Sequence, residues 1–440
     1  MSVKENFDQL NYPVIVIIGG GFGGLRLARK LSGKKYKVFL FDKNNYHNFQ
    51  PLMYQVATGG LGSDAIAYPF RKVIGPLPNV AYRMAQVENI HPEKNSIKTN
   101  VGEFSYNYLV LATGSATNYF GNAETEEKTI SIKSIPEALD IRSLILQEFE
   151  KAMLLKSDND KRKALNFVIV GGGPTGVELA GAMAEIKTTV MPSDYRELDP
   201  ALMNIHLLNA GERVLETMSE HASAGALKFL KELGVEVLLN TRMVSYNGNE
   251  IKLQNGDSMF AETVFWAAGV KGQVIRGTSE DSINKSRYIV NENNLIHGYN
   301  NIFAIGDVAE MTSVDFPRGH PMVAPVAMQQ ADRLAKNFVN ISDKKPLLPF
   351  NYIDKGSMAT VGRHKAVVDL KYYKFKGFFA WYIWMFLHLA LLIGFRNRFI
   401  VLMNWIWSYF SYERAIRLII RPYKSNRKGV KIENLKIREF

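Results

Sequence analysis

The sequence contains no cysteine among its 440 residues. Disulfide bridges, thiolate zinc sites, cysteine-ligated iron–sulfur clusters and redox-active dithiols are therefore excluded. The eight histidines are scattered and none follows a metal-binding spacing, so we expect no bound metal. The N-terminal stretch is polar and shows no cleavable signal peptide, which predicts a cytoplasmic catalytic body.

Acidic residues are scarce from residue 371 onward, where 14 lysines and arginines accompany three glutamates. The whole chain carries a net charge of +12, so nearly all of its excess positive charge lies in this segment. Residues 377–393 are almost uninterruptedly apolar, but the run is shorter than the roughly twenty residues of a membrane span. The segment holds four of the five tryptophans: Trp381, Trp384, Trp405 and Trp407.

Aromatic residues flanked by lysine and arginine are typical of helices that lie in a bilayer interface. A buried pair of dimer-forming helices is the alternative interpretation. Nucleic acid is not expected as a partner, because the basic residues flank long apolar runs instead of alternating with aromatic residues.

Residues 14–31 predict a buried strand, a glycine turn and a helix. Gly19, Gly21 and Gly24 follow the G-x-G-x-x-G spacing, and Asp42 ends the next apolar run. The glycines permit the turn, the approach of a pyrophosphate and close packing of helix on strand, and the acid can bind a ribose hydroxyl. This order predicts a site for an adenine dinucleotide, with its phosphates at the helix N-terminus.

The same pattern returns 152 residues later with Gly171, Gly173 and Gly176. Two such cassettes predict two dinucleotides bound by two similar domains. Asn209 stands where an acid normally binds the ribose. The absence of a carboxylate there weakens the case for NADH over NADPH, because it removes the main repulsion against a 2′-phosphate.

Other stretches connect these cassettes. Residues 44–61 predict a loop rich in aromatic and amide side chains, suited either to line a flat ring or to form an irregular packed connection. Ser134 and Glu137 predict a capping box that opens a helix of about twenty residues, followed by a charged linker at 157–163. Asp307 ends another apolar run, where it can bind a ligand hydroxyl or cap a helix.

The order of the motifs GGGFGG, FQPLMYQVATGGL, LVLATG, GGGPTGVELAG, WAAG, AIGD and APVAMQQ resembles the type II (alternative) NADH:quinone oxidoreductases. The resemblance implies an α/β fold with two Rossmann-like dinucleotide-binding domains and a C-terminal amphipathic, membrane-binding helical segment. It implies a discontinuous FAD-binding domain at 1–118 and 296–368, an NAD(P)H-binding domain at 119–295 and membrane association through 369–440.

The resemblance also assigns ligands to residues. It implies that non-covalent FAD is bound by Gly19, Gly21, Gly23, Gly24, Asp42, Lys43, Gln50, Thr113, Gly114 and Asp307. It implies that NADH is bound by Gly171, Gly173, Thr175, Gly176, Glu178, Asn209, Ala268 and Gly269.

Three residues are implied to be catalytic: Glu178, Gln329 and Lys365. Glu178 matches a family glutamate near the nicotinamide, although a glutamate early in a helix is also explained by the helix dipole. Gln329, Gln330 and Tyr54 are implied to contact the quinone. The family's A-Q-x-x-x-Q pattern keeps its second glutamine as Gln329 but has Pro325 at the first, which is a departure in the quinone contacts.

The resemblance thus implies FAD-dependent oxidation of NADH and two-electron reduction of a membrane quinone, menaquinone or ubiquinone, without proton pumping. It implies a peripheral enzyme on the cytoplasmic face of the cell membrane and leaves a homodimer open. Two alternatives remain at this point. One is an NAD(P)H reductase of the same superfamily that acts on a soluble acceptor such as ferredoxin, and the other is a flavin-containing membrane redox sensor without turnover.

Overall fold

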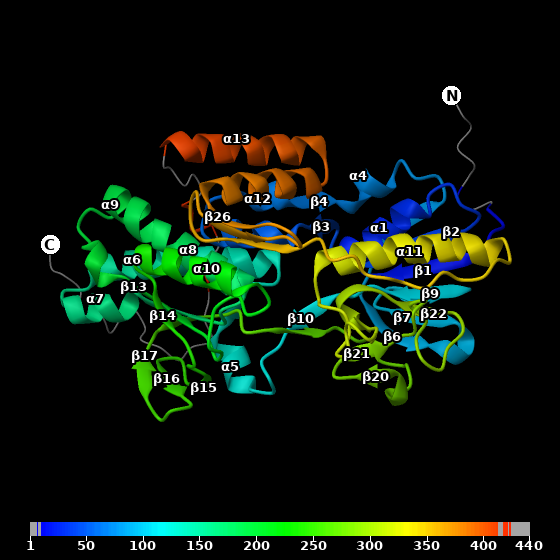
Figure 1. Ribbon diagram of the computed structural model, residues 1–440, viewed down its shortest axis with the longest axis horizontal. Helices are drawn as coiled ribbons and strands as arrows, with labels where there is room; N and C mark the ends of the chain where they lie inside the picture. The colour runs from blue at the N-terminus through cyan, green and yellow to red at the C-terminus, as the bar shows by residue number, and fades with distance from the viewer. Residues whose placement is uncertain (1–6, 8–9, 412–416, 421, 424–440) are drawn as a thin grey trace. The chain divides into compact units, whose positions relative to one another are not determined.

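The computed structural model describes Phe7, residues 10–411, residues 417–420, and residues 422 and 423 (Figure 1). The chain forms two compact units. The first comprises Met1–Asn48, Ala67–Ala116 and Val270–Asp354, and the second comprises Phe49–Ile66, Thr117–Gly269 and Lys355–Phe440. This division concerns compactness, and the assignment of ligand-binding domains stays a prediction.

A five-stranded parallel sheet forms the centre of the first unit, with strand order β22-β9-β1-β2-β5. Its strands are β1 (Val14–Ile18), β2 (Lys37–Asp42), β5 (Val80–Met84), β9 (Tyr108–Leu111) and β22 (Ile302–Ala304). The central strand is built from valine and isoleucine and is almost fully buried, as a parallel strand covered on both faces requires. Two helices, α1 (Phe22–Lys30) and α11 (Ala324–Ser342), pack against each other beside it.

The second unit repeats this arrangement with the parallel order β11-β18-β12-β13-β14. Its strands are β11 (Ile130–Ser131), β12 (Asn166–Val170), β13 (Asn204–Leu208), β14 (Glu236–Leu238) and β18 (Thr263–Trp266). In both units the strand that precedes the glycine turn is the central one. The carboxyl ends of parallel strands meet at one edge, so each sheet gathers its ligand-binding loops there.

Further helices and strands complete the two units. In the first unit these are β3 (Tyr46–Asn48), β4 (Ala67–Pro69), α4 (Phe70–Ile74), β6 (Val87–His91), β7 (Ser96–Thr99), β8 (Gly102–Ser105), β19 (Val270–Gly272), β20 (Ile283–Asn284), β21 (Arg287–Ile289), η7 (Gly306–Val308) and β23 (Ala309–Glu310). In the second unit they are η2 (Gln50–Leu52), α2 (Met53–Ala57), α3 (Ser63–Ile66), α5 (Ala123–Lys128), α6 (Ile135–Leu154), α7 (Asp158–Ala164), α8 (Pro174–Glu185), η4 (Ile186–Val190), α9 (Met191–Asp194), α10 (Glu220–Glu232), β15 (Met243–Tyr246), β16 (Glu250–Leu253), β17 (Ser258–Phe260), β24 (Ser357–Thr360), β25 (Ala366–Asp369), β26 (Lys374–Gly377), α12 (Phe378–Leu391) and α13 (Phe395–Ser411).

The capping box at the start of α6 is confirmed. The Ser134 and Glu137 side chains each bond the other's backbone amide, and the helix runs to Leu154. The linker predicted at 157–163 is wrong, because these residues form α7. Ser157 caps this helix, two aspartates lie in its first turn and three basic residues in its last, so the charges oppose the helix dipole at both ends.

The loop predicted at 44–61 is wrong in part. The segment contains strand β3, the short 3-10 helix η2 and helix α2. Strand β3 is held by antiparallel pairing with β4, which lies beyond the predicted loop in the sequence. Residues 46–48 therefore form a strand because of a pairing partner outside the stretch, which their composition does not reveal.

Helices α12 and α13 form a hairpin whose two helices lie side by side (Figure 1). The outward face of this hairpin is aromatic, with exposed side chains at Phe378, Phe379, Phe386, Phe395, Phe399 and Trp407. Arg398 donates to the carbonyl oxygens of Ala390 and Leu392 and so satisfies the end of α12. No helix in the described part of the chain is both long enough and apolar enough to cross a bilayer. Most of the basic tail after Ser411 lies outside the described residues.

Candidate active site

The first glycine turn leaves open space beside Gly21, at the N-terminus of α1. Gly19 adopts a φ of +100°, which favours glycine, and a Cβ on Gly24 would collide with the carbonyl oxygen of Gly19. Gly21 differs, because no described heavy atom lies within 4 Å of the position that its Cβ would take. The turn is thus tight where helix meets strand and open where a ligand would approach.

Both backbone groups of Gly20, the amide and the carbonyl, are hydrogen-bonded to side chains. Its amide donates to Oδ2 of Asp42 at 2.7 Å, and its carbonyl oxygen accepts from Nδ1 of His47 at 2.9 Å. Oδ1 of Asp42 accepts from the amide of Asn44 at 2.8 Å. Each carboxylate oxygen can accept more than one hydrogen bond, so Asp42 keeps capacity for a ribose hydroxyl. Burial raises the pKa of Asp42 above its ordinary value. His47 was missed by the sequence analysis, because one histidine in an aromatic stretch gives no signal.

Two further strand ends reach the same edge of the first sheet. The hydroxyl of Thr113 donates to the carbonyl oxygen of Gln273 at 2.6 Å, and Gly114 follows with a φ of +69°. Asp307 lies in η7 and accepts from the hydroxyl of Ser115 at 2.5 Å. Its carboxylate is therefore held at the carboxyl end of β22, where a ligand hydroxyl can reach it.

These residues fit a dinucleotide such as FAD. The open space that a side chain on Gly21 would fill lies at a helix N-terminus, which matches a pyrophosphate. The two positioned carboxylates match hydroxyls of its ribose groups. The other predicted FAD contacts differ in setting. Gly23 packs near Ile305 and Ala327 within the unit, Lys43 is exposed, and Gln50 is an exposed residue of the second unit.

The second cassette has the same geometry. Gly171 has a φ of +117°, a Cβ on Gly176 would collide with the carbonyl oxygen of Gly171, and the Cβ position of Gly173 is open within 4 Å of described atoms. Thr175 is exposed in the first turn of α8, while Ala268 and Gly269 follow β18 at the same sheet edge. These predicted contacts therefore surround a second open cradle.

Asn209 occupies in the second unit the place that Asp42 has in the first. Its Oδ1 accepts from the amide of Gly172 at 3.1 Å, and its Nδ2 donates to the carbonyl oxygens of Gly211 and Arg213. The guanidinium of Arg213 donates to two carbonyls of its own loop, at Glu216 and Met218. The amide thus organises the loop after β13, and the arginine is already committed to that loop.

A buried carboxyl lies on α8, the helix whose N-cap is Gly173 of the second cassette. Glu178 on α8 is 9% exposed, and its Oε1 lies 3.5 Å from the amide of Thr360 on β24. The hydroxyl of Tyr54 on α2 lies 2.9 Å from Oγ1 of Thr360 and accepts from Nε2 of Gln55 at 2.9 Å. Burial raises the pKa of Glu178 to about 8 and also raises the pKa of Tyr54. The structure therefore connects Tyr54 to Glu178 through Thr360, which sequence spacing could not reveal.

Three other predicted residues already have protein partners. The amide of Gln329 bonds both the N–H and the carbonyl of Ile353, at 3.0 and 2.9 Å. Oε1 of Gln330 accepts from the amide of Gly306 at 2.7 Å and so braces the turn that carries Asp307. Lys365 forms a salt bridge of 2.5 Å with Glu232 on α10 and lies over the ring of Phe229. Neither of these contacts of Lys365 involves Tyr54 or Glu178.

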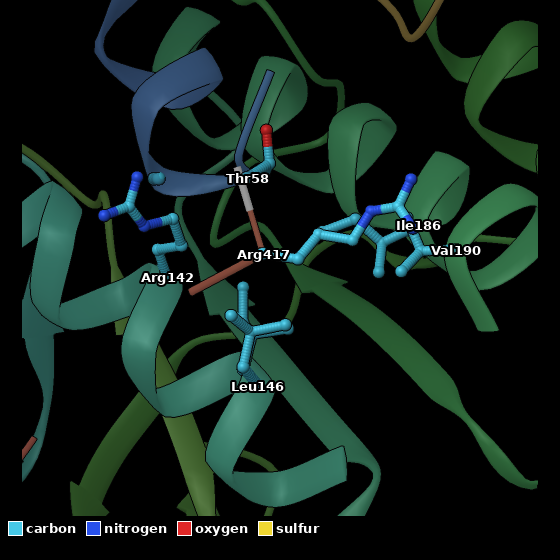
Figure 2. Close-up of a pocket in the computed structure, with 8 residues that line it drawn as sticks. Thr58, Arg142, Leu146, Ile186, Val190 and Arg417 are labelled. Atoms are coloured by element: carbon cyan, nitrogen blue, oxygen red, sulfur yellow. The ribbon is translucent and has the colours of Figure 1, made fainter. Parts of the chain in front are cut away.

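A small pocket of about 280 Å³, part of it open to solvent, lies in the second unit near the end of α2 (Figure 2). Its lining is mainly apolar and comprises Ala57, Thr58, Arg142, Ile145, Leu146, Ile186, Val190 and Arg417. Arg417 forms an ion pair with Asp194. None of the site residues predicted from the sequence lines this pocket, so it plays no part in the candidate site.

The family profile described as pyridine nucleotide-disulphide oxidoreductase matches residues 13–331, and the profile described as NDH2 C-terminal domain matches residues 355–411. The chain is 35% identical to the type II NADH:quinone oxidoreductase Ndh of Mycobacterium tuberculosis, over 91% of this chain and 89% of that protein. It is 30% identical to the type II NADH:quinone oxidoreductase of Haemophilus influenzae, over 81% and 86% of the two chains. The fold is similar to that of NDH2 from Plasmodium falciparum in complex with NADH, with a TM-score of 0.85 and 23% identity over 93% of this chain and all of that one.

Proposed function

Because this chain belongs to the type II NADH:quinone oxidoreductases, we propose that it couples the oxidation of NADH to the two-electron reduction of a membrane quinone through bound FAD, without pumping protons. The observation that carries the proposal is the open glycine cradle that occurs once in each compact unit. Two cradles match a cofactor that stays bound and a nicotinamide nucleotide that exchanges, as hydride transfer between two dinucleotides requires.

The overall reaction converts NADH, one proton and a quinone into NAD⁺ and a hydroquinone. When bound, FAD supplies a ring system that takes a hydride from the nicotinamide and passes two electrons on. The chain itself has to bind both nucleotides, orient them and supply protons. The absence of cysteine excludes a dithiol relay as an alternative electron path.

In this proposal the residues of the first cradle hold FAD. The open face of Gly21 and the N-terminus of α1 receive the pyrophosphate, and Asp42 accepts from a ribose hydroxyl. Asp307, fixed by the hydroxyl of Ser115, offers a second carboxylate at the same sheet edge. In the second cradle Gly173 receives the nicotinamide nucleotide, with the neutral Asn209 near its ribose.

Glu178 is proposed to hold a proton for the quinone. With a pKa of about 8, this carboxyl is protonated at neutral pH because it is buried. A reduced quinone needs protons, and a buried neutral carboxyl beside the Tyr54 hydroxyl can donate one. The predicted quinone contacts of Gln329 and Lys365 require these side chains to exchange Ile353 and Glu232 for the quinone.

We further propose that the enzyme is peripheral at the cytoplasmic face of the cell membrane, with the aromatic face of the α12–α13 hairpin in the lipid interface. Menaquinone or ubiquinone is the proposed acceptor, and a homodimer stays a prediction that light scattering of the purified protein tests. The aromatic face argues against a soluble acceptor such as ferredoxin, because exposed rings on this scale mark an interaction surface.

The proposal is tested with purified full-length protein and a short-chain quinone. We expect the protein to be yellow and to oxidise NADH with one hydroquinone formed per NADH, both in detergent and on vesicles. An enzyme that reduces ferredoxin and no quinone would favour the soluble-acceptor reductase. Bound FAD without any NADH oxidation would favour the redox sensor.

A further inference from the structure

The α12–α13 hairpin holds the Phe49–Ile66 segment as well as exposing an aromatic face. The side-chain amide of Asn397 donates to the carbonyl oxygens of Asp64 and Ala65, each at 3.1 Å, and Asn397 is 2% exposed. The rings of Phe49 and His388 meet edge to face, with centroids 6.2 Å apart. Both helices of the hairpin therefore contact the segment that carries Tyr54.

One contact joins the hairpin to Gln55, the residue next to Tyr54. The indole N–H of Trp405 on α13 donates to Oε1 of Gln55 at 2.8 Å. Nε2 of the same amide donates to the hydroxyl of Tyr54 at 2.9 Å. Trp405 is 8% exposed and packs against Trp384 at 5.7 Å, so its indole is fixed by packing.

The chain of contacts continues from Tyr54 to the acid. The hydroxyl of Tyr54 meets Oγ1 of Thr360 at 2.9 Å, and the amide of Thr360 points to Oε1 of Glu178 at 3.5 Å. A buried network of this kind fixes side-chain positions, because each unsatisfied member would incur a desolvation cost.

The amide of Gln55 bonds in both directions. Its oxygen accepts from Trp405 while its nitrogen donates to Tyr54. An ionised glutamate keeps the acceptor but has no donor, so the hydroxyl of Tyr54 would have to turn and donate to it. An apolar residue of the same length could make neither bond. Gln55 thus joins the hairpin to Tyr54 by its two ends.

We propose that Gln55 and Trp405 are positioning residues for quinone reduction, which hold Tyr54 and, through Thr360, the carboxyl of Glu178 in the arrangement set by the docked α12–α13 hairpin. The inference rests on the proposed function, since it concerns the quinone half of that reaction. It gives the hairpin a second task besides attachment to lipid: completing the proton-donating cluster. Among the described residues, the ionisable groups coupled to this network are Tyr54 on α2, and Glu178 and Glu185 on α8.

The experiment separates the two halves of the reaction in the full-length holoenzyme. Gln55→Met removes both hydrogen bonds. Gln55→Glu keeps the bond to Trp405 but replaces the donor to Tyr54 by an acceptor. Trp405→Phe keeps an aromatic ring but removes the N–H donor. Gln254→Met and Gln254→Glu are the matched controls, because Gln254 is an exposed glutamine of the same unit that lies outside both this network and the hairpin. FAD content and the melting temperature confirm that each variant is folded.

The first readout is the anaerobic reduction of the flavin by NADH, which we expect all variants to perform at the wild-type rate. The second is quinone reduction by the prereduced enzyme across pH 6–9. We expect Gln55→Met and Gln55→Glu to be about 3- to 10-fold slower, the effect of one or two hydrogen bonds. The alkaline decline of their rate should also begin at a lower pH than in the wild type. A looser network admits water to Glu178, and hydration lowers the pKa of that carboxyl. Trp405→Phe should show the same changes in smaller measure, and the two Gln254 variants should show none.

Wild-type pH profiles and rates in all three network variants would overturn the inference while leaving the proposed function intact. Equal slowing of flavin reduction and quinone reduction would also overturn it, since that pattern indicates general damage. A wild-type enzyme that reduces no quinone would instead remove the proposed function itself. If Gln55→Met does not fold, the comparison of Gln55→Glu with Gln254→Glu decides, because Gln55→Glu keeps the bond to the hairpin.

Discussion

Nδ1 of His47 donates to the carbonyl oxygen of Gly20 at 2.9 Å, at the centre of the first glycine turn. A carbonyl can only accept, so the proton of the neutral imidazole is on Nδ1. His47 is buried, its ring meets Phe22 edge to face, and burial lowers its pKa below the ordinary value. The ring therefore holds the turn from the side opposite to Asp42.

Replacing His47 by leucine should loosen this turn and weaken the retention of FAD. The loss of one buried hydrogen bond predicts release of FAD about 5- to 10-fold faster, measured by the rise of flavin fluorescence after dilution. His297→Leu is the control, because His297 is an exposed histidine of the same unit. Identical release rates in the two variants would show that His47 does not support the cradle.

Gly21 and Gly24 should respond differently to substitution although they belong to one motif. A side chain on Gly21 meets open space, so Gly21→Val should fold but lose FAD, whereas Gly24→Val should unfold because its Cβ collides with Gly19. Circular dichroism and the absorbance near 450 nm separate the two outcomes. A folded, fully yellow Gly21→Val protein would contradict the placement of the pyrophosphate.

Glu178 should set the alkaline limit of quinone reduction. With a pKa of about 8, its carboxyl loses the proton as the pH rises through that value, so the rate should fall above pH 8. Glu178→Gln should be slower by about 10- to 100-fold and should lack this decline. The measurement is kcat/KM for a short-chain quinone across pH 6–9. A variant that keeps the alkaline decline would assign it to another group.

The same group makes a prediction about stability. Because the folded-state pKa of Glu178 is raised, the folded protein binds more protons than the unfolded chain between about pH 4.5 and pH 8. Its contribution to stability is therefore present at low pH and is lost as the pH rises through this window. Glu178→Gln removes that loss, so the melting temperature of the variant relative to the wild type should increase from pH 6 to pH 9.

His388 should make the docking of the hairpin sensitive to acid. Burial lowers its pKa to about 4, its Nδ1 lies 2.7 Å from the carbonyl oxygen of Trp384, and its ring stacks on that indole at 4.2 Å. The unfolded chain takes up this proton near pH 6.5 and the folded chain only near pH 4, so stability is lost as the pH falls through that interval. His388→Phe should reduce this loss, followed by tryptophan fluorescence between pH 7 and pH 4.5. Unchanged acid sensitivity would place its origin elsewhere.

Asn209 should influence the choice of nucleotide. Asn209→Asp keeps the acceptor for the amide of Gly172 but adds a charge that repels a 2′-phosphate. We expect the preference for NADH over NADPH to increase about 10-fold, measured as the ratio of kcat/KM values. The charge replaces an amide donor to the loop, so the melting temperature serves as the control. An unchanged ratio in a folded variant would show that residue 209 does not face the ribose.

Structural features that depend on residues close together in the chain could be predicted from the sequence. The two glycine cassettes and the capping box at Ser134 depend on residues that are close in the chain, and the structure has the expected strand, turn and helix at each. The prediction of a linker at 157–163 rested on the number of charged residues. Their order, with aspartates first and basic residues last, favours a helix instead.

Long-range partners lay outside the reach of such spacings. Gln329 was assigned to the quinone from its motif, yet its amide bonds the backbone of Ile353 on a later segment. Gln55 and Thr360, which connect Tyr54 to the hairpin and to Glu178, carried no motif at all. A hydrogen bond between residues hundreds of positions apart leaves no period or spacing in a single sequence, so only the folded chain reveals it.

The bond between Gln55 and Trp405 joins residues that are 350 positions apart. Both glycine cassettes precede Trp405 in the sequence, so they leave the ribosome long before it does. Domains generally fold as units while synthesis continues. A nascent chain can therefore assemble its nucleotide cradles early, whereas the brace on Tyr54 forms only after Trp405 has been synthesised. A prematurely terminated product would retain the means to bind nucleotides and would lack the brace on Tyr54 for quinone reduction.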